Sequence, residues 1–203
     1  MTSYSWKPQL KHSLGLTLKF IIGWAIVAII LLLTGAKIEV GLLLGAVVTL
    51  WALPLIEIVT RTKIPDGLQL HYYAFITAAS VLGSSFGAYG SIPHWDTYVH
   101  VYSGVFLALF GLFIVLRAET ESKFSAPKWL SVMMAVGTPL AFATLWEITE
   151  YYIDLIFHTT MQAGGLEDTV IDMVAALVGG TIGILLVLWL KAPKSVLPRA
   201  LVK

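Results

Sequence analysis

The sequence contains no cysteine and few charged residues. The lack of cysteine excludes disulfides, thiolate metal sites and a cysteine nucleophile. Charged residues make up only 12% of the 203 residues, whereas soluble domains carry about 25%. The 13 Lys and Arg nearly balance the 12 Asp and Glu, which leaves a formal net charge of +1. Electrostatics therefore gives no reason to expect nucleic acid or a strongly acidic partner.

Apolar residues, in contrast, make up 58% of the chain and raise the mean hydropathy to +0.84. A disordered chain is excluded because disorder requires low hydrophobicity. Six apolar stretches approach or exceed the roughly 20 residues that cross a bilayer. They are residues 14–34, 40–60, 71–90, 97–116, 130–157 and 169–190. We predict an all-α polytopic integral membrane protein, in which six transmembrane helices form a single membrane domain over residues 1–203.

The Lys and Arg residues predict the orientation of the bundle, because short loops rich in them stay in the cytoplasm. All but Lys37 precede or enter the first span, follow the second, lie between the fourth and fifth, or follow the sixth. They are Lys7, Lys11, Lys19, Arg61, Lys63, Arg117, Lys123, Lys128, Lys191, Lys194, Arg199 and Lys203. We therefore predict cytoplasmic termini in a multi-pass protein of the bacterial cytoplasmic membrane, surrounded by membrane lipids.

Acidic residues gather instead in the outer halves of the last three predicted spans. They are Asp96, Glu147, Glu150, Asp154, Glu167, Asp168 and Asp172. At about 100° per residue, Glu147, Glu150 and Asp154 fall within roughly an 80° arc of one helix face. Two pairs are spaced i, i+4, so that each pair shares a face: Asp96 with His100, and Asp168 with Asp172. The three helices can therefore converge on one pocket that opens to the outside.

An ionised carboxylate inside a span is costly and normally faces a cavity or a partner. Apart from Lys37 in another loop, the outer half contains no Lys or Arg, so either the acids share protons or a bound cation supplies positive charge. We favour a divalent metal ion. Oxygen and imidazole ligands suit Mg²⁺, Mn²⁺, Ca²⁺, Fe²⁺ or Zn²⁺. The predicted metal ligands are Asp96, His100, Asp154, Asp168 and Asp172.

Some charged residues also have a structural interpretation. Asp96 and Asp168 stand at the beginnings of their spans, where Asp readily caps a helix, and this role does not exclude ligation. Glu57 and Arg61 are spaced i, i+4 at the cytoplasmic end of the second span. We interpret them as a structural ion pair whose side chains reach the interface. Glu167 is expected to be a solvated loop residue.

Three motifs on the last three spans carry a family resemblance. They are Asp96-x3-His100-x3-Gly104, Glu147-x2-Glu150 followed by Tyr151, and Asp168-Thr169-x2-Asp172-Met173. Over about residues 70–190 the chain resembles the YjdF-like family of uncharacterised bacterial inner-membrane proteins and is more distantly similar to VanZ-like proteins. Gly165 replaces a further Asp expected in the YjdF-like pattern, and Asp172 stands where VanZ-like proteins usually have Asn. The resemblance implies the fold and the site but no reaction.

Three functions fit these residues. In the first, the protein is a metal-dependent hydrolase or transferase acting on lipid or lipid-linked envelope substrates, with Glu150 or Glu147 as the general base. In the second, it is a cation- or proton-coupled transporter; residues 105–116 and 175–190 are almost wholly apolar, which disfavours a route to the cytoplasm. In the third, it is a non-catalytic scaffold that the metal stabilises.

Overall fold

The computed structural model describes residues 6–122, 125–162 and 164–189, and within these ranges it contains helices and no strand. The chain divides into two compact units, Met1–Trp95 and Asp96–Lys203. The basic residues Lys123, Lys191, Lys194, Arg199 and Lys203, which we used to predict the orientation, lie outside the described residues. The cytoplasmic termini and the single membrane domain stay predictions.

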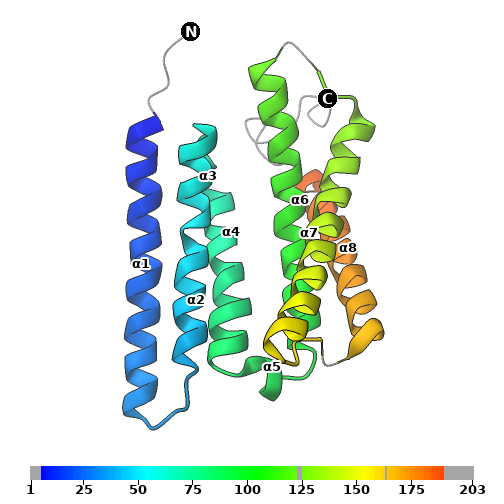
Figure 1. Cartoon of the computed structure of the whole chain (residues 1–203). Helices are drawn as coiled ribbons and strands as arrows, with labels where there is room; N and C mark the ends of the chain where they lie inside the picture. The colour runs from blue at the N-terminus through cyan, green and yellow to red at the C-terminus, as the bar shows by residue number, and fades with distance from the viewer. Residues whose placement is uncertain (1–5, 123–124, 163, 190–203) are drawn as a thin grey trace. The chain divides into compact units, whose positions relative to one another are not determined.

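The first unit is a set of helices joined by short turns (Figure 1). Its elements are α1 (Trp6–Leu33), α2 (Val40–Leu50), α3 (Ala52–Thr60), α4 (Asp66–Ile76), the π-helix η1 (Thr77–Ser85) and the short α5 (Ala88–Ser91). The chain turns after α1 at Gly35, whose φ of 81° lies in the left-handed region that favours glycine. Pro65 precedes α4, where a fixed φ and a missing N–H suit a helix start.

Hydrogen bonds between side chains join α1 to the helix formed by α4 and η1. The hydroxyls of Thr17 and Tyr73 lie 2.8 Å apart, and Trp24 Nε1 donates to Thr77 Oγ1 at 3.1 Å. Thr17 and Tyr73 are fully buried. In lipid such bonds hold helices together where the hydrophobic effect between them is weak.

The second unit consists of α6 (Trp95–Glu121), α7 (Lys128–Phe157) and α8 (Gly165–Trp189). The chain reverses direction between consecutive helices (Figure 1). The beginning of α6, the end of α7 and the beginning of α8 therefore lie at the same end of this unit. The predicted acidic residues occupy these three segments.

Glycines bring α6 and α8 into backbone contact. A Cβ atom on Gly104 would overlap the carbonyl oxygen of Ala176, and one on Gly179 would overlap that of Val101. His100 and Asp172 lie four residues before Gly104 and Ala176, one turn nearer the helix starts. The close packing of small residues therefore fixes these two side chains opposite each other.

Helix α7 packs against the same pair. A Cβ atom on Gly180 of α8 would lie 3.0 Å from Pro139 Cγ, and one on Gly111 of α6 would overlap the carbonyl oxygen of Met134. Close packing of all three helices therefore positions the acidic ends that carry the candidate site.

Five helices of the described chain are long and apolar enough to cross a membrane. They are Leu10–Leu33, Val40–Thr60, Trp95–Glu121, Lys128–Phe157 and Gly165–Trp189. The predicted third span, residues 71–90, is not among them. It is divided between α4 with 11 residues, η1 with 9 and α5 with 4. At about 1.5 Å per residue none of these three parts alone crosses a bilayer, so the six-helix count stays a prediction.

The interpretation of Glu57 and Arg61 as an ion pair is wrong. Among the described residues no ion pair joins them, and Glu57 is only 3% exposed. Glu57 Oε1 instead accepts the backbone N–H of Ile64 at 2.9 Å and the side-chain amide of Gln69 at 3.3 Å. Arg61 ends α3 in the left-handed conformation, with φ 51°. The carboxylate of Glu57 therefore stabilises the tight turn between α3 and α4 and does not pair with Arg61.

The turn between α6 and α7 is built in the same way. Glu119 is 1% exposed, and its Oε1 accepts the backbone N–H of Ala126 at 2.8 Å. As in the first turn, the acceptor lies seven residues before the donor, and a proline follows the donor. Both glutamates thus satisfy a buried N–H that no helix pairs.

Candidate metal centre

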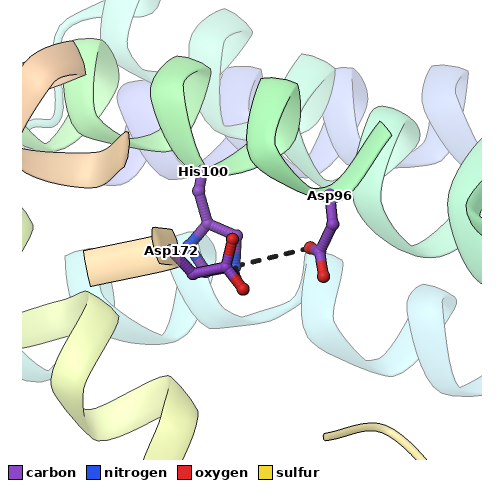
Figure 2. Close-up of side chains that lie close together, drawn as sticks. All are labelled: Asp96, His100 and Asp172. Atoms are coloured by element: carbon purple, nitrogen blue, oxygen red, sulfur yellow. Dashed lines mark ion pairs between the residues drawn. The ribbon is translucent and has the colours of Figure 1, made fainter. Parts of the chain in front are cut away.

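The structure brings together three of the predicted site residues, Asp96, His100 and Asp172 (Figure 2). His100 Nε2 lies 3.5 Å from Asp96 Oδ1 and 3.9 Å from Asp172 Oδ2. One potential ligand atom from each residue lies within 4.8 Å of the other two. Asp96 and His100 meet because they are four residues apart on α6, and Asp172 faces them from α8.

The inner part of this cluster is removed from solvent. Asp172 is 2% exposed and His100 is 6% exposed, whereas Asp96 is only partly buried. Within the described part of the chain, no hydrogen bond reaches the carboxylate of Asp96 or Asp172. His100 Nδ1 is also buried and has no hydrogen-bond partner there. Buried polar atoms are normally paired, so the cluster has an unused capacity to bind a ligand.

Three further predicted acids, Glu147, Glu150 and Asp168, interact electrostatically with the cluster. Glu147 and Asp168 interact electrostatically with His100 and Asp172. Glu150 experiences repulsion from Glu147, Asp96 and Asp172. Acidic groups of α6, α7 and α8 thus lie within electrostatic reach of one another.

No ion pair joins a Lys or Arg to any of these carboxylates within residues 6–122, 125–162 and 164–189. His100 is a nearby side chain that carries a positive charge when protonated, and its Nε2 faces two aspartates. Like charges that are close together and poorly hydrated repel one another strongly. A cation at this place would remove the repulsion and satisfy the unpaired oxygens.

Asp154 has another set of contacts. Its carboxylate accepts the hydroxyl of Thr159, the backbone N–H of Met161 at 2.8 Å and the backbone N–H of Gln162 at 2.9 Å. It thus organises the connection that leaves α7 after His158, which has φ 54°. The structure does not bring Asp154 together with Asp96, His100 and Asp172, although it shares their end of the unit.

Asp168 lies at the beginning of α8 and folds over the chain just before it. A Cβ atom on Gly164 would overlap the Cβ atom of Asp168 and lie 3.0 Å from Asp168 Oδ1. Gly165 has φ 65°, a conformation that favours glycine. This explains why glycine suits the position where the YjdF-like pattern led us to expect an aspartate. Asp168 stays outside the group of three but within electrostatic reach of it.

Sequence reasoning missed Gln162, which lies in the connection between α7 and α8. Its Nε2 lies 3.3 Å from Glu147 Oε2, 3.2 Å from the carbonyl oxygen of Glu147 and 3.1 Å from Thr169 Oγ1. A single amide thus links α7 to the first turns of α8. Helical periodicity carries no signal for this residue because it belongs to neither helix.

Two carboxylates and one imidazole form a donor set for a divalent metal ion. Carboxylate oxygens suit hard cations such as Mg²⁺ and Mn²⁺, and the imidazole nitrogen also suits Zn²⁺ or Fe²⁺. The residues fit such an ion because their potential ligand atoms converge, His100 and Asp172 are buried, and no Lys or Arg of the described chain pairs with either aspartate.

Comparison with known proteins finds a relative whose function is uncharacterised. The chain is similar to an uncharacterized protein of Thermotoga maritima, with 28% identity over 123 residues. This match covers 61% of the chain and spans only 62% of the length of that relative. No solved structure matches the chain. The matched relative is not described as YjdF-like or VanZ-like, so both resemblances stay predictions.

The model of one protein family covers most of the chain. Residues 16–192 match the family described as "Predicted membrane protein (DUF2238)". The matched region includes the five apolar helices almost completely and all the residues of the candidate metal centre. The chain is therefore a multi-pass membrane protein and belongs to the predicted membrane protein family DUF2238.

Proposed function

We propose that Asp96, His100 and Asp172 bind one divalent metal ion. The observation that carries this proposal is the buried imidazole of His100, whose Nε2 faces two carboxylates that receive no hydrogen bond and no Lys or Arg among the described residues. A divalent ion would balance both aspartates while it takes nitrogen and oxygen ligands. Asp168 is the next candidate ligand, whereas the oxygens of Asp154 are engaged in the connection to α8.

The activity that we propose for this site is hydrolysis or group transfer on a lipid or lipid-linked substrate of the cell envelope. A divalent ion bound there would polarise a phosphoryl or carbonyl oxygen and make a bound water more acidic. Glu150 is the proposed general base, which accepts the proton of the attacking water or hydroxyl. Trp146 Nε1 donates a hydrogen bond to Glu150 Oε1 at 2.8 Å and so restricts the carboxylate.

The surroundings of Glu150 favour a lipid substrate. Apolar and aromatic side chains near it on α7 are about half exposed: Leu145, Trp146, Ile148, Tyr151 and Tyr152. In a membrane protein such a face is in contact with lipid chains. A lipid head group at Glu150 would thus keep its chains in the bilayer. With cytoplasmic termini, as the sequence predicts, this end of the second unit faces outward.

The packing below the site favours chemistry over cation transport. Transport requires a polar route from the site across the rest of the membrane. Beneath His100, the backbones of α6 and α8 touch at Gly104 and Gly179, and Gly183 continues the contact one turn further. These contacts between glycines and carbonyl oxygens leave no room for a hydrated ion between the two helices.

Binding of Mn²⁺ to the full-length protein in detergent tests the metal site. We expect one site per chain, measured by the loss of the electron paramagnetic resonance signal of free Mn²⁺. His100→Ala should weaken binding by roughly 10-fold or more, because it removes a ligand. Glu121→Gln, which removes an exposed acid paired with Arg117 at the other end of α6, should leave binding unchanged. Wild-type protein that takes up no Mn²⁺ would refute the site.

Hydrolysis of lipids in mixed phosphatidylethanolamine and phosphatidylglycerol vesicles tests the proposed activity. We expect release of phosphate, head group or fatty acid that depends on added Mn²⁺. Glu150→Gln should abolish the release while leaving Mn²⁺ affinity within about 3-fold, because the base acts on the substrate and not on the metal. A fully active Glu150→Gln protein would remove Glu150 from this role.

A further inference from the structure

Two polar atoms beside the proposed metal site are buried and have no hydrogen-bond partner in the described part of the chain. They are His100 Nδ1 and Glu147 Oε1. His100 is 6% exposed and Glu147 is 5% exposed, so bulk solvent has little access to these two side chains. In folded proteins nearly all such atoms are paired, and an exception calls for an explanation.

The two atoms are complementary. His100 Nε2 faces the two aspartates and is therefore the nitrogen available to a metal ion. When one imidazole nitrogen binds a metal, the other carries the proton and donates a hydrogen bond. Glu147 is a carboxylate on the neighbouring helix that interacts electrostatically with His100. Its unpaired Oε1 is the acceptor that a protonated Nδ1 requires.

The other oxygen of Glu147 is already held. Gln162 Nε2 lies 3.3 Å from Glu147 Oε2, and the backbone N–H of Gln162 donates to Asp154 Oδ2 at 2.9 Å. Asp154 therefore fixes the backbone of Gln162, and the side chain of Gln162 fixes one oxygen of Glu147. Gln162 therefore restrains Oε2, and Oε1 is the oxygen of Glu147 that has no hydrogen-bond partner among the described residues.

The geometry points to Glu147 as the positioning residue of His100: when Nε2 binds a metal ion, Oε1 would accept a hydrogen bond from Nδ1–H and hold Nε2 toward Asp96 and Asp172. Gln162 positions Glu147 in turn. This inference rests on the proposed metal site. It assigns Glu147 a role different from the general base predicted from the sequence, and it leaves Glu150 as the proposed base.

A double-mutant cycle on Mn²⁺ affinity tests the inference, with the full chain in detergent. Loss of an outer partner of a metal-bound histidine typically weakens metal binding by about 10- to 100-fold. We expect this loss for Glu147→Ala and a smaller loss for Glu147→Gln, whose amide oxygen still accepts a hydrogen bond. In the His100→Ala background, Glu147→Ala should change the affinity by less than about 3-fold, because Glu147 acts through His100.

Two further variants keep the result interpretable. Gln162→Ala keeps the carboxylate of Glu147 but removes the amide that restrains it. We therefore expect weaker Mn²⁺ binding only when His100 is present. Glu167→Gln removes an exposed negative charge at the same end of α8 and should have no effect, which separates positioning from loss of charge. Each variant must elute as the same species as wild type before its affinity is compared.

Nitrogen NMR of histidine-labelled, Zn²⁺-loaded protein gives a second readout. We expect one histidine with a zinc-bound Nε2 and a protonated Nδ1, whose resonance is lost in His100→Ala and shifted in both Glu147→Ala and Gln162→Ala. If the wild type binds neither metal, the metal site itself fails. If it binds but Glu147→Ala leaves affinity and resonance unchanged, or weakens binding equally without His100, the metal site stands and the role of Glu147 is wrong.

Discussion

Glu119 and Glu147 are both almost completely buried in the second unit, but they lie at opposite ends of it and have opposite surroundings. Glu119 Oε1 accepts a backbone N–H in the turn between α6 and α7. Glu147 Oε1 accepts no hydrogen bond and shares its region with other acids and a histidine. Burial alone therefore does not identify a site. An unpaired oxygen alone does not identify one either, because the buried Oε2 of Glu57 also has no hydrogen-bond partner among the described residues. The informative feature of Glu147 is an unpaired oxygen that lies among other acids and a histidine.

The two kinds of carboxylate arise from different local structures. Glu57 and Glu119 each precede a tight turn that ends in a proline, and the turn presents one N–H that no helix pairs. The acids at the other end of the second unit lie on helix faces where backbone N–H groups are already bonded within the helices. Their oxygens must therefore be satisfied by side chains, by other segments or by a ligand.

The largest expected effect is the loss of metal binding on neutralising both aspartates of the cluster. The double variant Asp96→Asn and Asp172→Asn should bind Mn²⁺ at least about 100-fold more weakly, because two ligands lose their charge. In contrast, Glu57→Gln and Glu119→Gln should bind it like wild type. Titration of Mn²⁺ measures both. If Glu57→Gln and Glu119→Gln lost as much Mn²⁺ affinity as the double variant, the proposed difference between the cluster carboxylates and the turn carboxylates would be wrong.

The next effect concerns the packing that brings the cluster together. Gly179→Val places a side chain against the carbonyl oxygen of Val101 and forces α6 and α8 apart. Overpacking of this kind typically costs about 1–3 kcal/mol, and we expect the upper end or more because backbone atoms are involved. Both the melting temperature and the Mn²⁺ affinity should fall. Gly137→Ala is the control, since a Cβ atom there meets nothing within 4 Å.

Metal removal should lower stability only where the cluster is intact. A ligand at 100 times its dissociation constant stabilises the folded protein by about 2.7 kcal/mol. Wild-type protein in saturating Mn²⁺ should therefore melt several degrees higher than after chelation. The Asp172→Asn variant should show little difference between the two conditions. A shift of wild-type size in that variant would mean that the ion stabilises the protein from another place.

The smallest effect is expected at the satisfied carboxylate. Glu119→Ala leaves the buried N–H of Ala126 without its acceptor, which costs about 1–3 kcal/mol. The melting temperature should fall, whereas Mn²⁺ affinity should not change. Glu121→Ala in the same helix is exposed and should cause a smaller loss. Weaker Mn²⁺ binding by Glu119→Ala would contradict the claim that this carboxylate stabilises the turn between α6 and α7 without affecting the metal site.

Much of the candidate site was predictable because helical periodicity determines which residues share a face. The spacing of Asp96 with His100, and the position of Asp172 on another helix, predict the convergence that the structure shows for these three residues. These features depend on regular geometry, which the sequence specifies directly.

The contacts that were not predicted lie where the chain leaves regular structure. Asp154 shares the helix face of Glu147, but its carboxylate is engaged by the loop that follows α7. Gln162 lies in that loop, and no periodic pattern includes it. Glu57 turned out to bond a backbone N–H rather than Arg61, because the path of the turn determines which donor reaches the carboxylate.

The most direct test of the metal centre is the metal content of the full-length protein, purified without chelator and measured by elemental analysis. The variant with Asp96→Asn and Asp172→Asn, purified in parallel, is the comparison, and Glu119→Gln is the control for a buried carboxylate outside the cluster. We predict about one divalent ion per chain in wild type and in Glu119→Gln, and a small fraction of that in the double variant. Wild-type protein without a stoichiometric divalent metal, or a double variant that retains it, would contradict the account.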